Sequence, residues 1–215
     1  MLSAGNDIVS LSEINVARTI TEPLYSKILS VPEIALYEKI KYAILFEHYV
    51  WLLWSIKESA FKYLQRIDPE LLFTPVKFEI IQLNIPKGYF PVSFDGNENP
   101  LIITGHVEFD NYKIYSRSVI YEELISSVVD SDKDFKSVYY AIKYIDSTVN
   151  TVQSAAVRSF LIEHLVKETR IPNLTIGKNT DGIPVLFEGS KELPVPVSLS
   201  HHGHYIAYSF KLRLN

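Results

Sequence analysis

One segment of this chain, from Ser30 to about Ile67, has unbroken helical periodicity and limits the fold more than any other feature. Its apolar residues recur at intervals of three and four, which places them along one side of a helix. They include Leu36, Ile40, Ala43, Ile44 and Phe46. Ser30 can cap the first free amides, and Asp68-Pro69 ends the segment. Because this length is unusual for one helix, we expect a kink or a split near Phe46–Tyr49.

Most other segments are predicted to be strands, because they are short and rich in β-branched and aromatic residues. The candidates are Asp7–Leu11, Val76–Leu83, Leu101–Asp110, Tyr112–Val129, Tyr139–Ile145, Val185–Phe187, Val197–Leu199 and Tyr205–Leu212. A second helix is predicted over Thr151–Thr169, where helical spacing returns. We therefore expect an α+β fold with two halves, 1–111 and 112–215, each built from strands and one long helix.

The composition excludes several classes of site and location. The 215 residues include no cysteine, which excludes disulfides, thiolate metal sites and cysteine nucleophiles. A net charge of −4 disfavours nucleic-acid binding through a broad basic surface. The most apolar stretch, Tyr42–Ile56, contains Glu47 and His48, so no membrane span is expected. The start lacks a basic region followed by an apolar one, so the predicted location is the cytoplasm.

Two places in the first half could contribute to a metal site. Asp7 follows Gly5 at the start of a predicted strand, where a carboxylate can point into a cleft at the sheet edge. Trp54, Glu58 and Lys62 are spaced four residues apart and share one helical face. Mg²⁺ prefers one or two carboxylates, with water and phosphate as the other ligands. Taken singly, Asp7 is also typical of a turn, and Glu58 with Lys62 of an exposed ion pair.

The second half offers groups that could bind phosphate. In the segment Ser198–His201 the two serines share one face of a predicted strand, and His201 lies at its end. His202 and His204 share strand parity, but no further histidine lies nearby in the sequence to complete a zinc site. Arg158 on the second helix has a planar, forked guanidinium that suits phosphate, although a surface arginine explains it equally well.

Together and in this order, these segments resemble the pattern of the 4'-phosphopantetheinyl transferase superfamily. That pattern has a Gly-x-Asp strand, a Trp-x-x-Lys-Glu-(Ala/Ser)-x-x-Lys helix and a Ser-x-Ser-His strand. Here they stand as Gly5-Asn-Asp7, Trp54-Ser-Ile-Lys57-Glu58-Ser-Ala-Phe-Lys62 and Ser198-Leu-Ser200-His201. The resemblance implies two similar α+β lobes related by a pseudo-twofold axis, each with a small antiparallel sheet and a long helix.

The resemblance also implies an activity, that of a holo-acyl-carrier-protein synthase. Such an enzyme transfers 4'-phosphopantetheine from coenzyme A to a serine of an acyl or peptidyl carrier protein, and it requires Mg²⁺. Asp7 and Glu58 would bind the metal, and Glu58 and Lys62 would be the catalytic residues. Contacts to coenzyme A would come from Lys62, Arg158, Ser200 and His201. The carrier could serve the synthesis of fatty acids, polyketides or nonribosomal peptides.

The order of the motifs predicts how the lobes are arranged. The acidic half comes first, as in the short, trimeric holo-acyl-carrier-protein synthases, but this chain is nearly twice their usual length. We therefore expect a monomer that is a pseudodimer, with a metal-binding lobe at 1–111, a coenzyme A phosphate-binding lobe at 112–215 and one site between them. The charges agree, with 9 basic against 14 acidic residues in the first part (−5) and 12 against 11 in the second (+1).

Two positions depart from the family pattern. Val9 stands where many long members have a third acid, so the proton acceptor stays open between Glu58, neutral Lys62 and a water molecule. Ile183 stands where the family often has lysine, so one phosphate contact is missing or comes from Lys178. These departures leave open a degenerate protein that binds coenzyme A or a carrier without transfer.

The Ser-His pair of the third motif could also belong to an unrelated hydrolase. Adjacent residues of a strand point to opposite faces, so Ser200 and His201 are poorly placed to exchange a proton. The sequence therefore favours the transferase.

Overall fold

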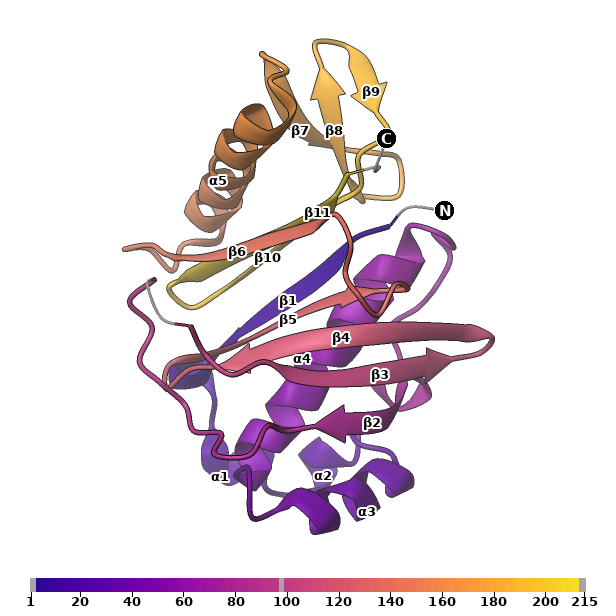
Figure 1. Ribbon diagram of the computed structural model, residues 1–215, viewed down its shortest axis with the longest axis vertical. Helices are drawn as coiled ribbons and strands as arrows, with labels where there is room; N and C mark the ends of the chain where they lie inside the picture. Colours follow the sequence, from indigo (N-terminus) through magenta and orange to yellow (C-terminus); the bar gives the residue numbers. More distant parts are fainter. Residues whose placement is uncertain (1–2, 97–98, 213–215) are drawn as a thin grey trace.

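The computed structural model describes residues 3–96 and 99–212, and it has the mixed α+β fold that the sequence predicts (Figure 1). Its largest sheet has five antiparallel strands in the order β1-β5-β4-β3-β2. They are β1 (Gly5–Ser10), β2 (Glu79–Asn84), β3 (Ile103–Phe109), β4 (Tyr112–Ile120) and β5 (Leu124–Asp130). The segment predicted as one strand, Tyr112–Val129, is two strands, because the chain turns back between Ile120 and Leu124.

One face of this sheet is covered by α4 (Phe46–Gln65) (Figure 1). The predicted split of the long helical segment is confirmed, although it lies at 41–45, between α3 (Val31–Ile40) and α4. The short elements of this half, which the sequence did not predict, are η1 (Leu11–Glu13), α1 (Val16–Thr19), α2 (Glu22–Tyr25) and η2 (Pro75–Lys77). Leu52, Leu53 and Ile56 of α4 are fully buried in the core between helix and sheet.

A buried ion pair fixes α4 to its surroundings. Lys57, the first lysine of the Trp-x-x-Lys-Glu motif, pairs with Glu33 at 2.6 Å, and neither side chain is exposed. Lys57 also donates to the carbonyl oxygen of Ile28 at 2.6 Å. Glu33 accepts hydrogen bonds from the backbone N–H groups of Ser30 at 2.7 Å and Ile80 at 2.9 Å. Since each charge has further hydrogen-bond partners besides the other, the pair can hold α3, α4 and β2 together.

The second half has two three-stranded sheets and one long helix. Its elements are β6 (Val138–Tyr144), α5 (Asn150–Thr169), β7 (Leu174–Lys178), β8 (Pro184–Glu188), β9 (Lys191–Leu193), β10 (Val197–His202) and β11 (Tyr205–Lys211). One sheet has the order β10-β11-β6 and the other β7-β8-β9. The helix α5 and the strands β6, β8, β10 and β11 lie where the sequence predicts them, whereas β7 and β9 were not predicted.

The two halves meet where β1 lies beside β10 (Figure 1). A buried ion pair crosses this seam, with Lys211 Nζ 2.6 and 2.8 Å from the carboxylate oxygens of Asp130. The boundary expected between Asn111 and Tyr112 falls in the turn that joins β3 to β4, two paired strands of one sheet. Sheet membership changes instead within 131–137. The pseudo-twofold relation of the lobes stays a prediction.

The helices also bear on the question of a membrane span. Within residues 3–96 and 99–212, none is both long enough and apolar enough to pass through a lipid bilayer.

Candidate functional site

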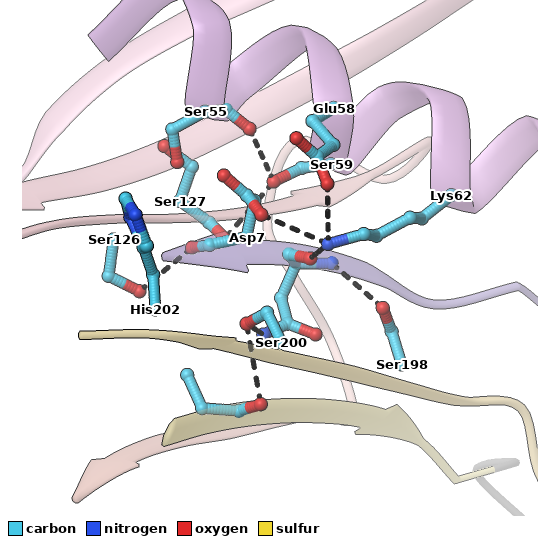
Figure 2. A network of polar contacts seen from close by, with 12 residues as sticks. Asp7, Ser55, Glu58, Ser59, Lys62, Ser126, Ser127, Ser198, Ser200 and His202 are labelled. Atoms are coloured by element: carbon cyan, nitrogen blue, oxygen red, sulfur yellow. Dashed lines mark hydrogen bonds and ion pairs between the residues drawn. The ribbon is translucent and has the colours of Figure 1, made fainter. Parts of the chain in front are cut away.

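Asp7, Glu58 and Lys62 meet where α4 passes over β1 (Figure 2). Lys62 Nζ lies 3.0 Å from Asp7 Oδ1 and 3.2 Å from Glu58 Oε1. The same ammonium donates to the carbonyl oxygen of Asn6 at 3.2 Å. The two carboxylates, which lie far apart in the sequence, therefore share one cation. Their nearest oxygens can be no farther apart than the sum of the two ion-pair distances.

Gly5 permits this close approach of β1 and α4. A Cβ atom at Gly5 would overlap the carbonyl oxygen of Ser59 and would lie 2.9 Å from Tyr63 Cβ. Glycine lets the strand pass directly beneath the helix. Asp7, two residues later, points to the same side of the strand, toward Lys62. The Gly-x-Asp spacing thus provides clearance at one residue and a carboxylate at the next inward position.

Burial determines the electrostatics of the three groups. Asp7 is 4% exposed, and its Oδ2 atom has no hydrogen-bond partner within the described part of the chain. Burial raises the pKa of Asp7 to about 7, although the Lys62 charge opposes the rise; Glu58 adds to it. Burial alone would lower the pKa of Lys62, but Asp7 and Glu58 outweigh it, so the Lys62 pKa is raised. Glu58 and Lys62 stay open to solvent, with 27% and 24% of their side chains exposed.

These residues fit a magnesium ion better than a metal held by protein alone. Among the residues that the structure describes, no three His, Asp or Glu side chains are grouped to hold a metal, which gives the zinc reading of His202 and His204 no support. An ion at Asp7 and Glu58 would take its other ligands from water or substrate, as Mg²⁺ commonly does. The unpartnered Oδ2 of Asp7 is a suitable first ligand.

The serines of the third motif face β1. Ser198 Oγ accepts the backbone N–H of Asn6 at 3.2 Å, and Ser200 Oγ accepts a side-chain N–H of Asn6 at 2.7 Å. Ser200 Oγ also donates to the carbonyl oxygen of Ala207 at 3.4 Å. These buried hydroxyls hold β10 against β1 (Figure 2), so Asn6 is a positioning residue that the sequence did not reveal. A contact of Ser200 with coenzyme A stays a prediction.

The facing half contributes two basic side chains, His201 and Arg158. Burial lowers the pKa of His201, and the charges of Lys62, Arg158 and His202 lower it further. The Arg158 guanidinium lies back along α5, where it donates to the carbonyl oxygen of Ser154 at 2.7 Å and to the Ser154 hydroxyl. Lys62 and Arg158 are therefore both within electrostatic range of His201. Basic side chains gathered in this way are typical of phosphate-binding sites.

His202 is a further residue at the seam that the sequence did not place there. Its Nδ1 atom accepts the backbone N–H of Ser10 at 3.0 Å, which puts the proton of the neutral ring on Nε2. Gly203 follows at a φ of 58°, and a Cβ there would be 2.7 Å from Ser10 Cβ. Gln153 Nε2 donates to the carbonyl oxygen of Gly203 at 2.5 Å. The His-Gly pair was the only signal in the sequence for this tight hairpin.

The two departures from the family pattern are both buried. Val9 is 2% exposed in the core beneath α4, where it supplies no metal ligand. Ile183 lines a cavity of about 280 Å³ between the end of α4 and the small β7-β8-β9 sheet. Arg66 lines the same cavity and donates to the carbonyl oxygens of Pro184 and Val197. Burial lowers the pKa of Arg66 to about 10. Arg66 thus provides a basic group at this cavity, whereas Ile183 occupies the position where the family often has lysine.

Comparison with known proteins bears on the first half of the chain. A family model described as the 4'-phosphopantetheinyl transferase superfamily matches residues 3–114, just over half of the sequence. No curated protein and no solved structure matches the chain. The matched segment contains Asp7, Glu58 and Lys62, the three residues that meet where α4 passes over β1. On this evidence the chain belongs to the 4'-phosphopantetheinyl transferase superfamily.

Proposed function

We propose that this chain transfers the 4'-phosphopantetheine group of coenzyme A to a serine of an acyl or peptidyl carrier protein, in a magnesium-dependent reaction. The observation that carries the proposal is the convergence of Asp7 and Glu58 on one cation, with His201 of the other half within electrostatic range of Lys62. Coenzyme A carries a pyrophosphate and a 3'-phosphate. Two carboxylates that hold a metal ion suit the pyrophosphate, and basic side chains suit both the pyrophosphate and the 3'-phosphate.

The metal would be held by the two carboxylates that now share Lys62. Asp7 would contribute its buried carboxylate, whose Oδ2 is unpartnered, and Glu58 its solvent-open one. When bound, magnesium neutralises negative charge on the pyrophosphate and orients it for in-line attack. We further propose that Lys62, Ser200, His201 and Arg158 contact coenzyme A, with Arg158 at the 3'-phosphate.

The reaction exchanges one P–O bond for another. The serine oxygen of the carrier forms a bond to the phosphorus that bears the pantetheine arm. The bond from this phosphorus to the bridging oxygen breaks, and adenosine 3',5'-bisphosphate leaves with its electron pair. The serine proton must pass to an acceptor. Lys62 already donates to three oxygens, so it acts as a hydrogen-bond donor, which favours Glu58 over Lys62 as the acceptor.

The proposed site needs only one chain. Asp7, Lys62 and His201 belong to one polypeptide, and β10 is held against β1 by direct hydrogen bonds. We therefore propose a monomer in which the first lobe binds the metal and the second binds the phosphates of coenzyme A.

Mass spectrometry of an apo carrier protein tests the proposal directly. The carrier is incubated with coenzyme A, Mg²⁺ and the full chain, and we expect its serine to gain about 340 Da, the mass of the arm. Omission of Mg²⁺ or addition of a chelator should prevent the gain.

The same experiment separates the transferase from a binding protein. Val9 and Ile183, which replace an acid and a lysine of the family pattern, are the observations that favour a degenerate binder. Binding of coenzyme A without any gain of mass, across acyl and peptidyl carriers, would support that second reading and contradict transfer.

A further inference from the structure

The Lys62 ammonium occupies the position between the two carboxylates. It lies 3.0 Å from Asp7 Oδ1, 3.2 Å from Glu58 Oε1 and 3.2 Å from the Asn6 carbonyl oxygen. These contacts surround Nζ with oxygens from three residues, two of them charged. The ammonium therefore sits where a cation bound by Asp7 and Glu58 would sit.

The charges of this group favour a divalent cation over a single ammonium. Asp7 and Glu58 carry two negative charges when ionised, and Lys62 balances one of them. The Oδ2 atom of Asp7 is buried without a partner, so the ammonium does not satisfy the carboxylate that it contacts. A divalent ion would supply the second charge and the missing contact.

Lys62 is the member of the group that can move. Asp7 is 4% exposed, lies in the β1–β5 ladder opposite Ser127, and has its carbonyl oxygen bonded by the Ser126 hydroxyl. Lys62 has a flexible stem, and 24% of its side chain is exposed. Burial lowers the pKa of His201 on the facing half, and the Lys62 charge lowers it further, so His201 is within electrostatic range of Nζ.

We propose that Lys62 holds the cation position in the ligand-free enzyme, and that a divalent metal displaces its ammonium toward the phosphate-binding side. Lys62 thereby couples the two steps, because metal binding releases the donor that the coenzyme A phosphates need. This inference rests on the proposed function, since it takes Asp7 and Glu58 as the metal ligands.

The test begins with metal binding, measured without coenzyme A or carrier. Mn²⁺ is titrated into the full chain and into Lys62→Met by calorimetry. Because the substitution removes a competing positive charge from the site, we expect Mn²⁺ to bind about fivefold to tenfold more tightly. In the presence of Mn²⁺, the same variant should bind coenzyme A more weakly than the wild type. Opposite signs for the two ligands are not expected of a residue that only supports the fold.

A matched control is the variant Lys41→Met. Lys41 also pairs with a glutamate on its own helix segment, Glu38, at 2.7 Å, but it belongs to the surface and not to the site. Its Mn²⁺ affinity should equal that of the wild type. Lys62→Gln replaces Lys62→Met if circular dichroism shows that the latter is not folded.

A second measurement uses the wild-type chain. The ¹⁵N signal of the Lys62 ammonium, assigned by its loss in Lys62→Gln, should shift when Mg²⁺ is added, because its carboxylate partners are replaced. An unchanged signal at saturating Mg²⁺ overturns the inference.

The outcomes separate this inference from the proposed function. Mn²⁺ binding by the wild type with no gain in either Lys62 variant overturns the displacement of Lys62 and leaves the transferase proposal intact. No Mn²⁺ binding by the wild type or the variants contradicts the metal site itself, and both proposals fall.

Discussion

Asp7 is buried beneath α4, yet one of its carboxylate oxygens has no partner, and Lys62 is the cation that it contacts. A buried carboxylate with incomplete compensation is costly to ionise, which is why the pKa of Asp7 is raised to about 7. A residue kept in such a place lowers the stability of the ligand-free protein. If Asp7 binds a metal as proposed, the benefit of this cost is a site that is ready for a cation.

The variant Asp7→Asn should show this cost as a function of pH. In the unfolded chain Asp7 ionises near its ordinary pKa of 3.8, and in the folded chain only near 7. The wild type therefore loses stability as pH rises from about 4 to 7, whereas the asparagine variant does not. Without metal, the variant should be more stable by a few kcal/mol at pH 8 and equal to the wild type below pH 4. Urea unfolding at several pH values measures the difference, and a less stable variant at pH 8 would contradict it.

Glu58 should be required for transfer but not for folding. Its side chain is 27% exposed, and its ion pair within the described part of the chain is with Lys62, so Glu58→Ala should leave the melting temperature nearly unchanged. Loss of a metal ligand and proton acceptor should reduce the rate by about 10²-fold or more. The transfer assay with saturating Mg²⁺ measures the rate. Glu38→Ala, which removes another helix carboxylate paired with a lysine, is the control with full activity. Persistent transfer by Glu58→Ala would reject the role.

At the scale of elements, α4 shows how one helix separates stability from chemistry. Lys57 and Lys62 are five residues apart, so they point in directions about 140° apart around the helix. Lys57 points into the protein and pairs with Glu33, while Lys62 contacts Asp7 of β1 and keeps 24% of its side chain exposed. The sequence motif contains both lysines, but only the position around the helix tells which of them can meet a substrate.

Lys57→Met should therefore destabilise the fold. The substitution leaves Glu33 as a buried carboxylate without its cation, which typically costs about 3–5 kcal/mol. Urea denaturation should show a lower midpoint. Lys41→Met removes an exposed lysine from a similar pair and should change the midpoint little. Equal midpoints for the two variants would show that the Lys57 pair contributes no more than a surface pair.

At the scale of the whole molecule, β1 belongs to the sheet of the first half and also contacts the second half. It pairs with β5 along one edge and is held against β10 by the hydrogen bonds of Asn6 and Ser10. Asp7 therefore reaches α4 from a strand that also fixes the position of the Ser-His motif. Any shift of the second half relative to β1 would change the distance between the carboxylates and His201.

The whole site should work in a single chain. Light scattering should give the mass of one chain, 24.6 kDa, and activity per chain should not fall on dilution. The reason is that the carboxylates, Lys62 and His201 come from one polypeptide. An obligate trimer whose activity disappears on dilution would contradict the single-chain site.

Much of the site was visible in the sequence because its spacing is local. Glu58 and Lys62 are one helical turn apart, so their pairing follows from helix geometry. The long helices and most of the longer strands were also predicted, since the spacing of their apolar residues depends on near neighbours in the sequence. The strand β9 was missed because three residues carry too little periodic signal, and β7 was missed although it is as long as the predicted β8.

Only the tertiary structure decided which distant segments meet. The sequence determined the α+β fold class, the helix that carries Glu58 and Lys62, and the motif order. It did not determine that β1 pairs with β5, that Asn6 holds Ser198 and Ser200, or that the first sheet continues past Asn111. Strand pairing depends on partners far away in the chain, and no local pattern encodes the partner. Lys62 lies between the carboxylates for the same reason: Gly5 and Asp7 reach α4 only in the folded molecule.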